Sequence, residues 1–508
     1  MLIELLLAVT FTIALIIFLV PDAVAARLAA VLSLLPIGLS ALLWLGFTGT
    51  GNALLGGQVA HVTDIRWLSL SGYELYWFVG VDGISLPLVV LTTVLTTLAI
   101  VSAWTPIENR QSEFYGLMLF MEASLLGVFT ALDFFVWFVF WEAVLVPMYL
   151  LIGIWGGPER RYAAIKFFVY TNVASLVMFI AFIAMVFSMG DAVSTFRLPA
   201  IAEAVRSGAI GPIGILAPGM VELVVFVAIF IGFAVKVPVA PLHTWLPDAH
   251  VQAPTPVSVM LAGVLLKMGT YALLRFNFTM FPDAAVTLAV PIAAIAVISV
   301  IYGALLALAQ TDLKRVVAYS SVSSMGYVIL GLVAYTSFGI GGATFQMVAH
   351  GLISGLMFMA VGVIYNVTHT REIAQMSGVT DRLPVAAWIF VAGAFGYMGL
   401  PLMAGFAAEF FIFKGAFAST VSPLMPLFTA LAMFGIVIVA GYLLFAMQRS
   451  LFGPFYVSGL DDLERAARHD VAPMMVLLAL IIVLGVAPEI IFGMIQDAVQ
   501  PLLPGGVS

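Results

Sequence analysis

About fourteen apolar stretches, most of them close to twenty residues long, follow one another along this 508-residue chain. A helix that crosses the hydrocarbon core of a bilayer needs about 20 apolar residues, so each stretch is long enough to span a membrane. Charged residues make up only 9% of the chain, whereas soluble domains carry about 25%. The sequence therefore predicts an all-α integral membrane protein with about fourteen transmembrane helices.

Short polar connections separate the predicted spans. The spans cover residues 2–20, 28–47, 84–104, 114–132, 134–154, 163–189, 221–242, 256–276, 286–308, 316–335, 342–367, 384–418, 423–447 and 472–495. We expect an N-terminal three-span segment (1–113), a first five-helix repeat (114–281), a second five-helix repeat (282–449), and an amphipathic connector with the last span (450–508). Because each repeat (spans 4–8 and 9–13) holds an odd number of spans, the second is expected to be inverted relative to the first.

The basic residues predict the orientation of the chain. Lys and Arg in alternate connections divide into twelve on one side and four on the other, the four being Arg66, Arg197, Arg206 and Arg275. Cytoplasmic loops carry the excess of positive charge, so the side with twelve is expected to face the cytoplasm. Both termini are then expected on the periplasmic side of the membrane.

Five ionisable residues fall inside five different predicted spans: Glu142, Lys236, Lys267, His350 and Glu409. A charged side chain at the centre of a bilayer costs at least ~2.5–3.5 kcal/mol on insertion scales. These residues could pair internally and only fix the helix packing, but polar contacts between membrane helices average ~0.6 kcal/mol, which does not offset five insertions. The five residues are therefore predicted to be functional. Glu122 and Lys414 fit either interpretation.

Prolines lie beside two of these residues. Pro238 and Pro241 follow Lys236, and Pro401 precedes Glu409. Proline breaks a helix, which is tolerated at membrane depth only where the freed backbone faces protein or water. Broken helices with a charge beside the break are typical of ion-translocating transporters. We therefore predict broken helices at spans 7 and 12.

Three stretches resemble the antiporter-like subunits of respiratory complex I, and in particular the subunit M group, the counterpart of mitochondrial subunit 4. They are WEAVLVPMYLLIGIWGG at 141–157, VKVPVAPLHTWLPDAHVQAPTPVSVMLAGVLLKMGTYALLRF at 235–276 and DLKRVVAYSSVSSMGYV at 312–328. The resemblance extends over nearly the whole chain. It implies a proton-translocating membrane subunit of a bacterial NADH:quinone oxidoreductase, located in the inner membrane.

The resemblance also implies a role for each buried ionisable residue, in a relay driven by redox chemistry in other subunits. Glu142 and Lys236 are similar to the charge pair of the family, and Lys267 to its central connecting lysine. His350 then corresponds to a relay group and Glu409 to the terminal proton-loading carboxylate. The family usually has a histidine where this chain has Ser324. That difference leaves open the route between Lys267 and His350.

Partners and cofactors follow from the same resemblance. The expected partners are other membrane-arm subunits of complex I, the lipid bilayer, protons and internal water, with no nucleic acid. The chain has no cysteine, which excludes a thiolate-held iron–sulfur cluster. We expect no cofactor and no metal in this subunit, so that it serves the enzyme as a non-redox translocase. His243 and His250 lack metal-ligand spacing and are expected to be structural or interfacial.

Three other functions are compatible with parts of the pattern. A subunit of a multisubunit Na+/H+ antiporter, or of an energy-converting hydrogenase membrane arm, would share the fold and most of the buried charges. A helical scaffold that only docks its neighbours would not explain five deep charges and two broken helices.

Overall fold

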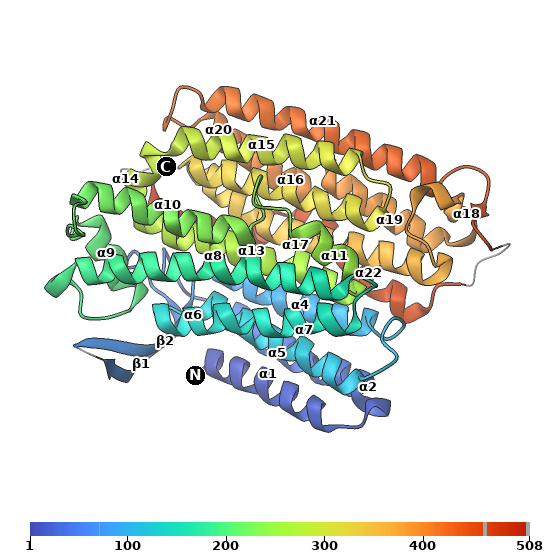
Figure 1. Ribbon diagram of the computed structural model, residues 1–508, viewed down its shortest axis with the longest axis horizontal. Helices are drawn as coiled ribbons and strands as arrows, with labels where there is room; N and C mark the ends of the chain where they lie inside the picture. Colours follow the sequence, from blue (N-terminus) through green and yellow to red (C-terminus); the bar gives the residue numbers. More distant parts are fainter. Residues whose placement is uncertain (71, 461–464, 504–508) are drawn as a thin grey trace.

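The computed structural model describes residues 1–70, 72–460 and 465–503. Long helices run side by side through the molecule (Figure 1). Thirteen helical stretches in this part of the chain are long and apolar enough to cross a membrane. They match thirteen of the predicted spans, and the other, at 384–418, consists of two shorter helices of 14 residues each. The prediction of a many-span helical membrane protein is confirmed.

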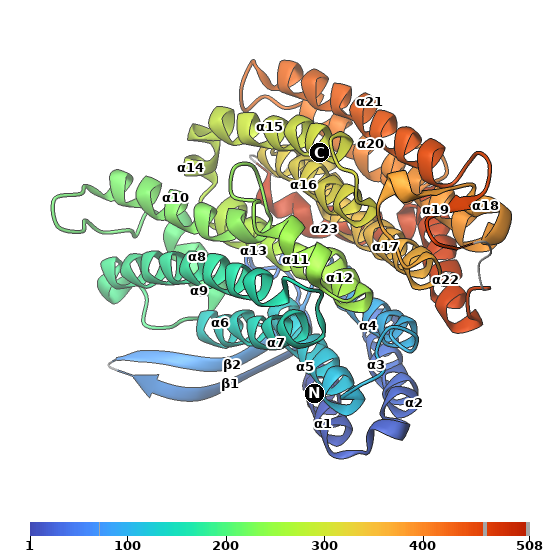
Figure 2. The same cartoon turned by 45° about the vertical axis from the view of Figure 1, so that its right-hand side comes forward.

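The N-terminal part contains four helices and a β-hairpin. Its elements are α1 (Leu2–Leu19), α2 (Asp22–Leu32), α3 (Leu34–Leu45), β1 (Ala60–Leu70), β2 (Tyr73–Val81) and α4 (Ser85–Ser102). The strands pair antiparallel, from Ala60 opposite Val81 to Leu70 opposite Tyr73. The hairpin projects from the bundle (Figure 2). The sequence did not predict this hairpin, which lies in the connection between the second and third predicted spans.

The next part carries the first of the two broken helices. Its α-helices are α5 (Gln111–Thr130), α6 (Phe134–Ala143), α7 (Leu145–Trp155), α8 (Arg160–Ser188), α9 (Leu198–Arg206), α10 (Pro218–Lys236), α11 (Leu246–Gln252), α12 (Thr255–Met260) and α13 (Leu266–Ala272). A short 3₁₀ turn, η1 (Gly190–Ala192), follows α8. Two π-helical segments, η2 (Leu261–Leu265) and η3 (Leu273–Phe278), flank α13 within one continuous helix over Thr255–Phe278, called the central helix below.

The remaining elements form the other side of the bundle. They are α14 (Pro282–Thr287), α15 (Ala289–Leu308), α16 (Leu313–Val333), α17 (Ser337–Thr368), η4 (Ile373–Gln375), β3 (Met376–Ser377), α18 (Val379–Arg382), α19 (Pro384–Tyr397), α20 (Ala404–Phe417), α21 (Met425–Ser450), β4 (Tyr456–Val457), α22 (Arg468–Val486), α23 (Glu489–Val499) and η5 (Gln500–Leu502). The last predicted span, 472–495, is divided, because α22 ends at Val486 and α23 begins after Pro488.

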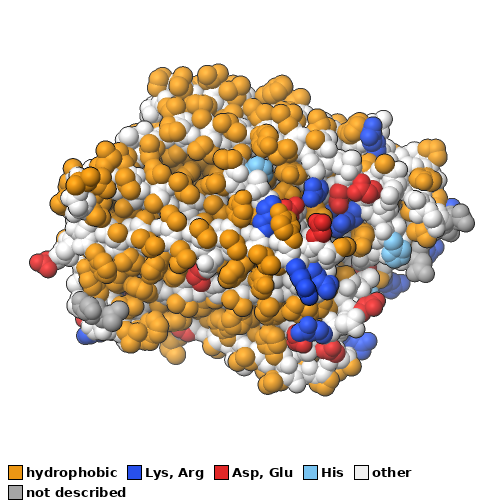
Figure 3. All heavy atoms as spheres, viewed as in Figure 1, with side chains coloured by type: hydrophobic (Ala, Val, Ile, Leu, Met, Phe, Trp, Pro, Cys, Tyr) orange, Lys and Arg blue, Asp and Glu red, His pale blue; other side chains and the backbone are white. Residues whose placement is uncertain are grey.

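Both ends of the chain lie toward the same end of the bundle, and the N-terminus lies beside the hairpin (Figure 1). Contacts agree with this placement, since the Met1 amino group donates to Thr63 of β1 and the Asn52 side chain donates to the Ala498 carbonyl of α23. We call it the terminal end. Charged side chains gather toward the opposite end on the face seen in Figure 3, the basic end, and the surface between is mostly apolar. The periplasmic location of the termini stays a prediction.

The central helix and α17 form the core of the bundle. Nearly every residue of Thr255–Phe278 is buried, and most of the 32-residue α17 is buried against it and against α20. By contrast, α2 and α3 expose much of their apolar surface, as lipid-facing helices do. Ionisable side chains on the two core helices are therefore enclosed by protein rather than by lipid.

Candidate functional site

The five ionisable residues picked from the sequence lie on five elements of the bundle. Glu142 is on α6, Lys236 on α10, Lys267 on α13, His350 on α17 and Glu409 on α20. Glu142 is half-buried and the other four are buried. The structure brings one pair into direct contact, Lys267 with His350.

Lys236 is the last residue of α10, where the first broken helix opens. Its Nζ lies 3.7 Å from the centre of the Trp141 ring and donates to the Trp141 carbonyl at 3.5 Å. Both the aromatic face and the carboxyl end of a helix stabilise a cation. The Trp245 indole, beyond the break, donates to the Val235 carbonyl at 2.8 Å and satisfies part of the opened backbone. This site can hold a protonated lysine without an ion pair.

Glu142 lies one residue from Trp141 but forms no ion pair with Lys236. Its Oε2 accepts a hydrogen bond from the Asn172 amide at 3.3 Å, while its Oε1 has no partner among the described residues. The carboxylate still acts electrostatically on Lys236. The helix is interrupted at Val144, between α6 and α7, and Pro147 follows. The charge pair implied by the sequence is thus open in this structure.

Lys267 and His350 meet where the central helix crosses α17. The Lys267 Nζ lies 2.6 Å from His350 Nδ1, and it also donates to the Ala262 carbonyl at 2.5 Å. Gly263 and Gly351 make this close crossing possible, because a Cβ on Gly351 would come within 2.8 Å of the Gly263 carbonyl oxygen. Small residues at helix crossings let the backbones approach.

Ser324 is the position at which the route between Lys267 and His350 was left open, and the structure places these two side chains in direct contact. Ser324 lies buried on α16. It does not need to bridge Lys267 and His350, because these two side chains touch without it. The sequence could not show this, since the contact joins residues 83 positions apart.

Glu409 lies just beyond the second broken helix, on α20. Its carboxylate packs over Gly399 in the break, where a Cβ would come within 2.5 Å of Glu409 Oε2. Gly399 also has a φ of +63°, a conformation that side chains disfavour. Glu409 Oε2 is buried and has no hydrogen-bond partner among the described residues. The carboxylate therefore faces into the protein.

Two tyrosines lie on the His350 and Glu409 side of the bundle. The Tyr397 ring lies 5.7 Å from the His350 ring, centre to centre. The charge of Glu409 acts electrostatically on the Tyr442 hydroxyl. His350 Nε2 and both tyrosine hydroxyls are buried without a hydrogen-bond partner in the described part of the chain. Buried polar atoms are normally satisfied by protein or ordered water. This region is therefore suited to hold internal water.

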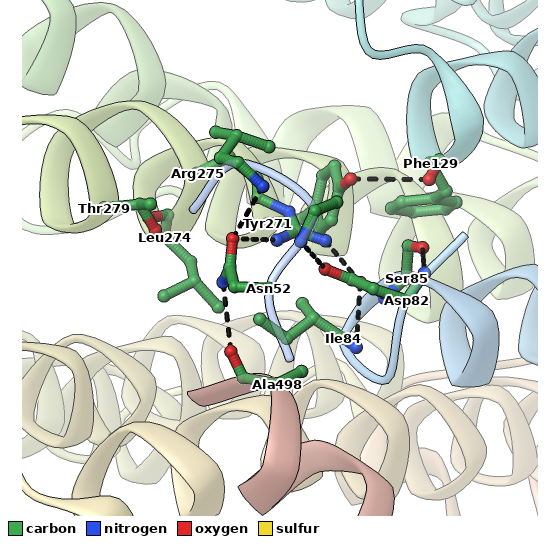
Figure 4. A network of polar contacts seen from close by, with 12 residues as sticks. Asn52, Asp82, Ile84, Ser85, Phe129, Tyr271, Leu274, Arg275, Thr279 and Ala498 are labelled. Carbon is green, nitrogen blue, oxygen red and sulfur yellow. Dashed lines mark hydrogen bonds and ion pairs between the residues drawn. The ribbon is translucent and has the colours of Figure 1, made fainter. Parts of the chain in front are cut away.

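Sequence analysis missed one buried ion pair completely. Arg275 of η3 donates to Asp82, before α4, at 2.5 Å, and each residue is only 1% exposed (Figure 4). Burial by itself would raise the pKa of Asp82, but the Arg275 charge and hydrogen bonds to the carboxylate outweigh it and hold this pKa below its ordinary value. Counting Arg275 as a loop residue was wrong. The signal was available, because position 275 lies inside the predicted span 256–276.

The five residues Glu142, Lys236, Lys267, His350 and Glu409 are called the row below. Three other residues do not belong to the row. His250 is fully buried and stacks on Phe358, with 4.5 Å between the ring centres. It also interacts electrostatically with Lys314 and Lys267. Glu122 is fully buried on α5, with no hydrogen-bond partner for either oxygen in the described residues. Lys414 is exposed, with its Nζ 3.5 Å from the centre of the Phe338 ring. Lys414 therefore lies outside the buried row.

Comparison with known proteins places these residues in a family. The family model described as "NADH:quinone oxidoreductase/Mrp antiporter, TM" matches residues 131–436. The chain belongs to this family. The match contains both broken helices and all five ionisable residues of the row.

Curated members of the family include subunits of NADH-quinone oxidoreductase. Subunit M from Rhodobacter capsulatus is 42% identical over 451 residues, covering 87% of this chain and 84% of the relative. Chain 4 3 of the NAD(P)H-quinone oxidoreductase of Trichormus variabilis is 44% identical over 394 residues, covering 77% of this chain and 70% of the relative. The chain is thus an antiporter-like membrane subunit of the complex I type.

Solved structures of the family have the same fold. A chain of respiratory complex I from Thermus thermophilus superposes with a TM-score of 0.84 at 27% identity, covering 99% of this chain and 100% of that chain. A chain of the Mrp complex from Dietzia sp. superposes with a TM-score of 0.81 at 19% identity, covering 98% of this chain and 97% of that chain, which shows the fold alone.

Proposed function

We propose that this chain translocates protons across the membrane through Glu142, Lys236, Lys267, His350 and Glu409, driven by redox chemistry in other subunits of an NADH:quinone oxidoreductase. The observation that carries the proposal is the Lys267–His350 contact at 2.6 Å in the core of the bundle. A buried amine and a buried imidazole at this distance can share one proton, whereas two charged groups would repel each other. The identity to subunit M relatives favours this function over a Na+/H+ antiporter or a hydrogenase membrane arm.

His350 is suited to pass a proton onward because an imidazole has two nitrogens. Nδ1 faces Lys267, while Nε2 is buried without a partner in the described residues. A proton received at Nδ1 allows another to leave from Nε2. Onward transfer to Glu409 then uses the tyrosine hydroxyls and internal water of that region. The five groups titrate as a coupled set rather than one by one.

Glu142 and Lys236 would control the first step. Lys236 rests on Trp141 rather than on Glu142 in this structure. Movement of the Glu142 carboxylate toward Lys236 stabilises the proton on the amine, and movement away favours its release toward Lys267. In the open arrangement described above, the Glu142 carboxylate is not paired with Lys236, and Trp141 is the group in contact with the amine.

The test is proton pumping in inverted membrane vesicles, compared at matched NADH oxidation rates. Glu142→Gln, Lys236→Ala and Lys236→Arg should each abolish most pumping while the complex still assembles on native gels, and arginine fails because it cannot release its proton. Lys414→Ala, which changes an exposed lysine outside the row, is the control and should pump normally. Normal pumping in Lys236→Arg would exclude proton release at this site.

We also propose that the chain lies in the bacterial inner membrane with both termini in the periplasm, next to other membrane-arm subunits. The charge distribution supports this orientation, because the basic residues gather at the end opposite the termini. A fluorescent reporter fused after Ser508 should stay dark, whereas alkaline phosphatase at the same position should be active. Bright cytoplasmic fluorescence would contradict the topology.

A further inference from the structure

Arg275 lies eight residues after Lys267 on the central helix, toward the terminal end of the bundle. Two helical turns separate them, or roughly 12 Å along the axis. Tyr271 lies between them, its ring 5.0 Å from the Arg275 guanidinium and its hydroxyl donating to the Phe129 carbonyl at 3.4 Å. Tyr271 and then Arg275 therefore lie along the central helix between Lys267 and the terminal end of the bundle.

Asp82 holds Arg275 rigidly at this position (Figure 4). Besides the guanidinium, its carboxylate accepts backbone N–H groups of Ala53 at 2.9 Å and of Ile84 and Ser85 at 3.0 Å. These contacts join the connection after α3, the start of α4 and the end of the central helix.

Asn52 completes the enclosure from the side of the chain termini. Its side-chain oxygen accepts from Arg275 Nη1 at 3.3 Å and its amide donates to the Ala498 carbonyl of α23 at 3.1 Å. Helix α23 also packs directly on Gly83, where a Cβ would lie 1.9 Å from the Met494 carbonyl oxygen. The ion pair is thus covered by two layers of chain.

These groups cannot carry a proton. A relay needs groups that both accept and donate, but a guanidinium only donates and keeps its proton in proteins. The Asp82 carboxylate only accepts while it is ionised, and its oxygens already accept four hydrogen bonds. A fixed arginine charge in a narrow passage also repels protons and other cations.

The lateral direction from Lys267 has the opposite chemistry. His350, Tyr397 and Tyr442 can each accept and donate protons, and each has a buried polar atom without a partner in the described part of the chain. A proton on Lys267 therefore has an acceptor beside it, whereas the end beyond Tyr271 is closed by the Arg275–Asp82 ion pair.

We propose that the Arg275–Asp82 pair is a proton barrier that closes the terminal end of the central helix and forces protons on Lys267 to leave sideways through His350. The barrier prevents leakage across the membrane while the relay is loaded. This inference rests on the proposed translocation through Lys267.

The test is passive proton flux through the purified complex reconstituted in liposomes. Neither NADH nor quinone is added; a potassium gradient with valinomycin sets the voltage, and an internal pH dye reports the flux. Arg275→Gln should raise the flux about tenfold or more over the unmodified complex, because the repelling charge is lost. Arg275→Lys keeps a cation beside Asp82 and should stay tight. Arg197→Gln is the matched control, because Arg197 pairs with Asp64 at 2.8 Å at the same end but is about a third exposed.

If Arg275→Gln does not assemble, the double variant Arg275→Gln/Asp82→Asn replaces it. Removing both charges avoids leaving one buried charge unpaired. The same increase in flux is expected. An assembled variant whose proton flux is not increased would overturn the barrier. Equal leakage in Arg275→Lys would also overturn it, because loosened packing rather than loss of the positive charge would then open the path.

Adding Lys267→Ala to the leaking variant distinguishes the barrier from the proposed function. Loss of the leak supports a path through Lys267, as proposed, and a persisting leak overturns the statement that the barrier protects Lys267. Normal pumping in Lys236→Arg together with a leaking Arg275→Gln would overturn the proposed relay but not the barrier. A tight Arg275→Gln with defective Lys236 variants would overturn only the barrier.

Discussion

Lys267 and Arg275 are both buried cations on the central helix, yet their surroundings differ in every respect that matters for proton transfer. Lys267 lies 2.6 Å from the His350 imidazole, which can be neutral or protonated. Arg275 donates to the Asp82 carboxylate, which also accepts backbone hydrogen bonds. Lys267 lies at a glycine-lined crossing of two core helices, and Arg275 lies under the surface helix α23. Burial alone therefore does not identify a relay group, because the neighbouring side chains determine whether the charge can change.

Lys267→Arg should cause the largest loss of proton pumping, because it places a cation that cannot deprotonate at the relay position. Loss of a positioned acid–base group reduces rates by about 100-fold or more. We expect this loss in proton pumping by inverted vesicles, with assembly retained. Arg275→Lys, the reciprocal exchange, should pump nearly as well as the unmodified complex. Equal pumping by both variants would refute the distinction between the two sites.

Arg275→Leu should destabilise the assembled protein, since it leaves Asp82 buried and unpaired. Breaking a buried ion pair on one side costs about 3–5 kcal/mol. Arg197→Leu removes a pair of which each side chain is about a third exposed, and such pairs are worth about 0–1 kcal/mol. The measurement is the temperature at which half of the complex is lost on native gels. Similar midpoints for the two variants would show that the Arg275 pair is not important for stability.

Gly351→Ala should separate Lys267 from His350 without removing either. The added Cβ would meet the Gly263 carbonyl oxygen at 2.8 Å and must push the two helices apart. Proton transfer falls steeply with such displacements, so pumping should drop by about tenfold. Gly355→Ala on the same helix is the control, because its Cβ would meet side chains only, the nearest being the flexible end of Leu95 at 3.1 Å. A normal Gly351→Ala variant would show that the direct contact is dispensable.

Ser324→Ala should have the smallest effect, a change in pumping of less than about twofold. A serine hydroxyl does not ionise near neutral pH, and the Lys267–His350 contact bypasses it. His350→Ala should be far worse, since it removes the relay partner itself. A loss in Ser324→Ala as deep as in His350→Ala would show that the hydroxyl is an obligatory link. Pumping at matched NADH oxidation measures both variants.

Much of the architecture could be predicted from the sequence, because membrane spans depend on local composition. A run of about 20 apolar residues spans a bilayer whatever surrounds it. Charges within such runs are costly and therefore conspicuous, which is how Lys267 and Glu409 were found. Proline likewise acts on its own helix, so the breaks near Lys236 and Glu409 were expected and are present.

Contacts between helices could not be predicted in this way. The Lys267–His350 bond joins residues 83 apart and the Arg275–Asp82 bond joins residues 193 apart. The sequence also could not show whether Glu142 and Lys236 are in contact; in the structure they form no ion pair, and the Lys236 amine lies against Trp141.

The membrane class, the approximate positions of most spans, the broken helices and the residues that carry charge into the membrane thus follow from the sequence alone. Which of these charges touch, and which are held in an ion pair, depends instead on how the helices pack. The physical reason is that insertion into a membrane depends on each segment's own composition, whereas proton transfer depends on distances of about 3 Å between side chains from different helices. Those distances are set by small features of packing, such as the glycines at positions 263 and 351.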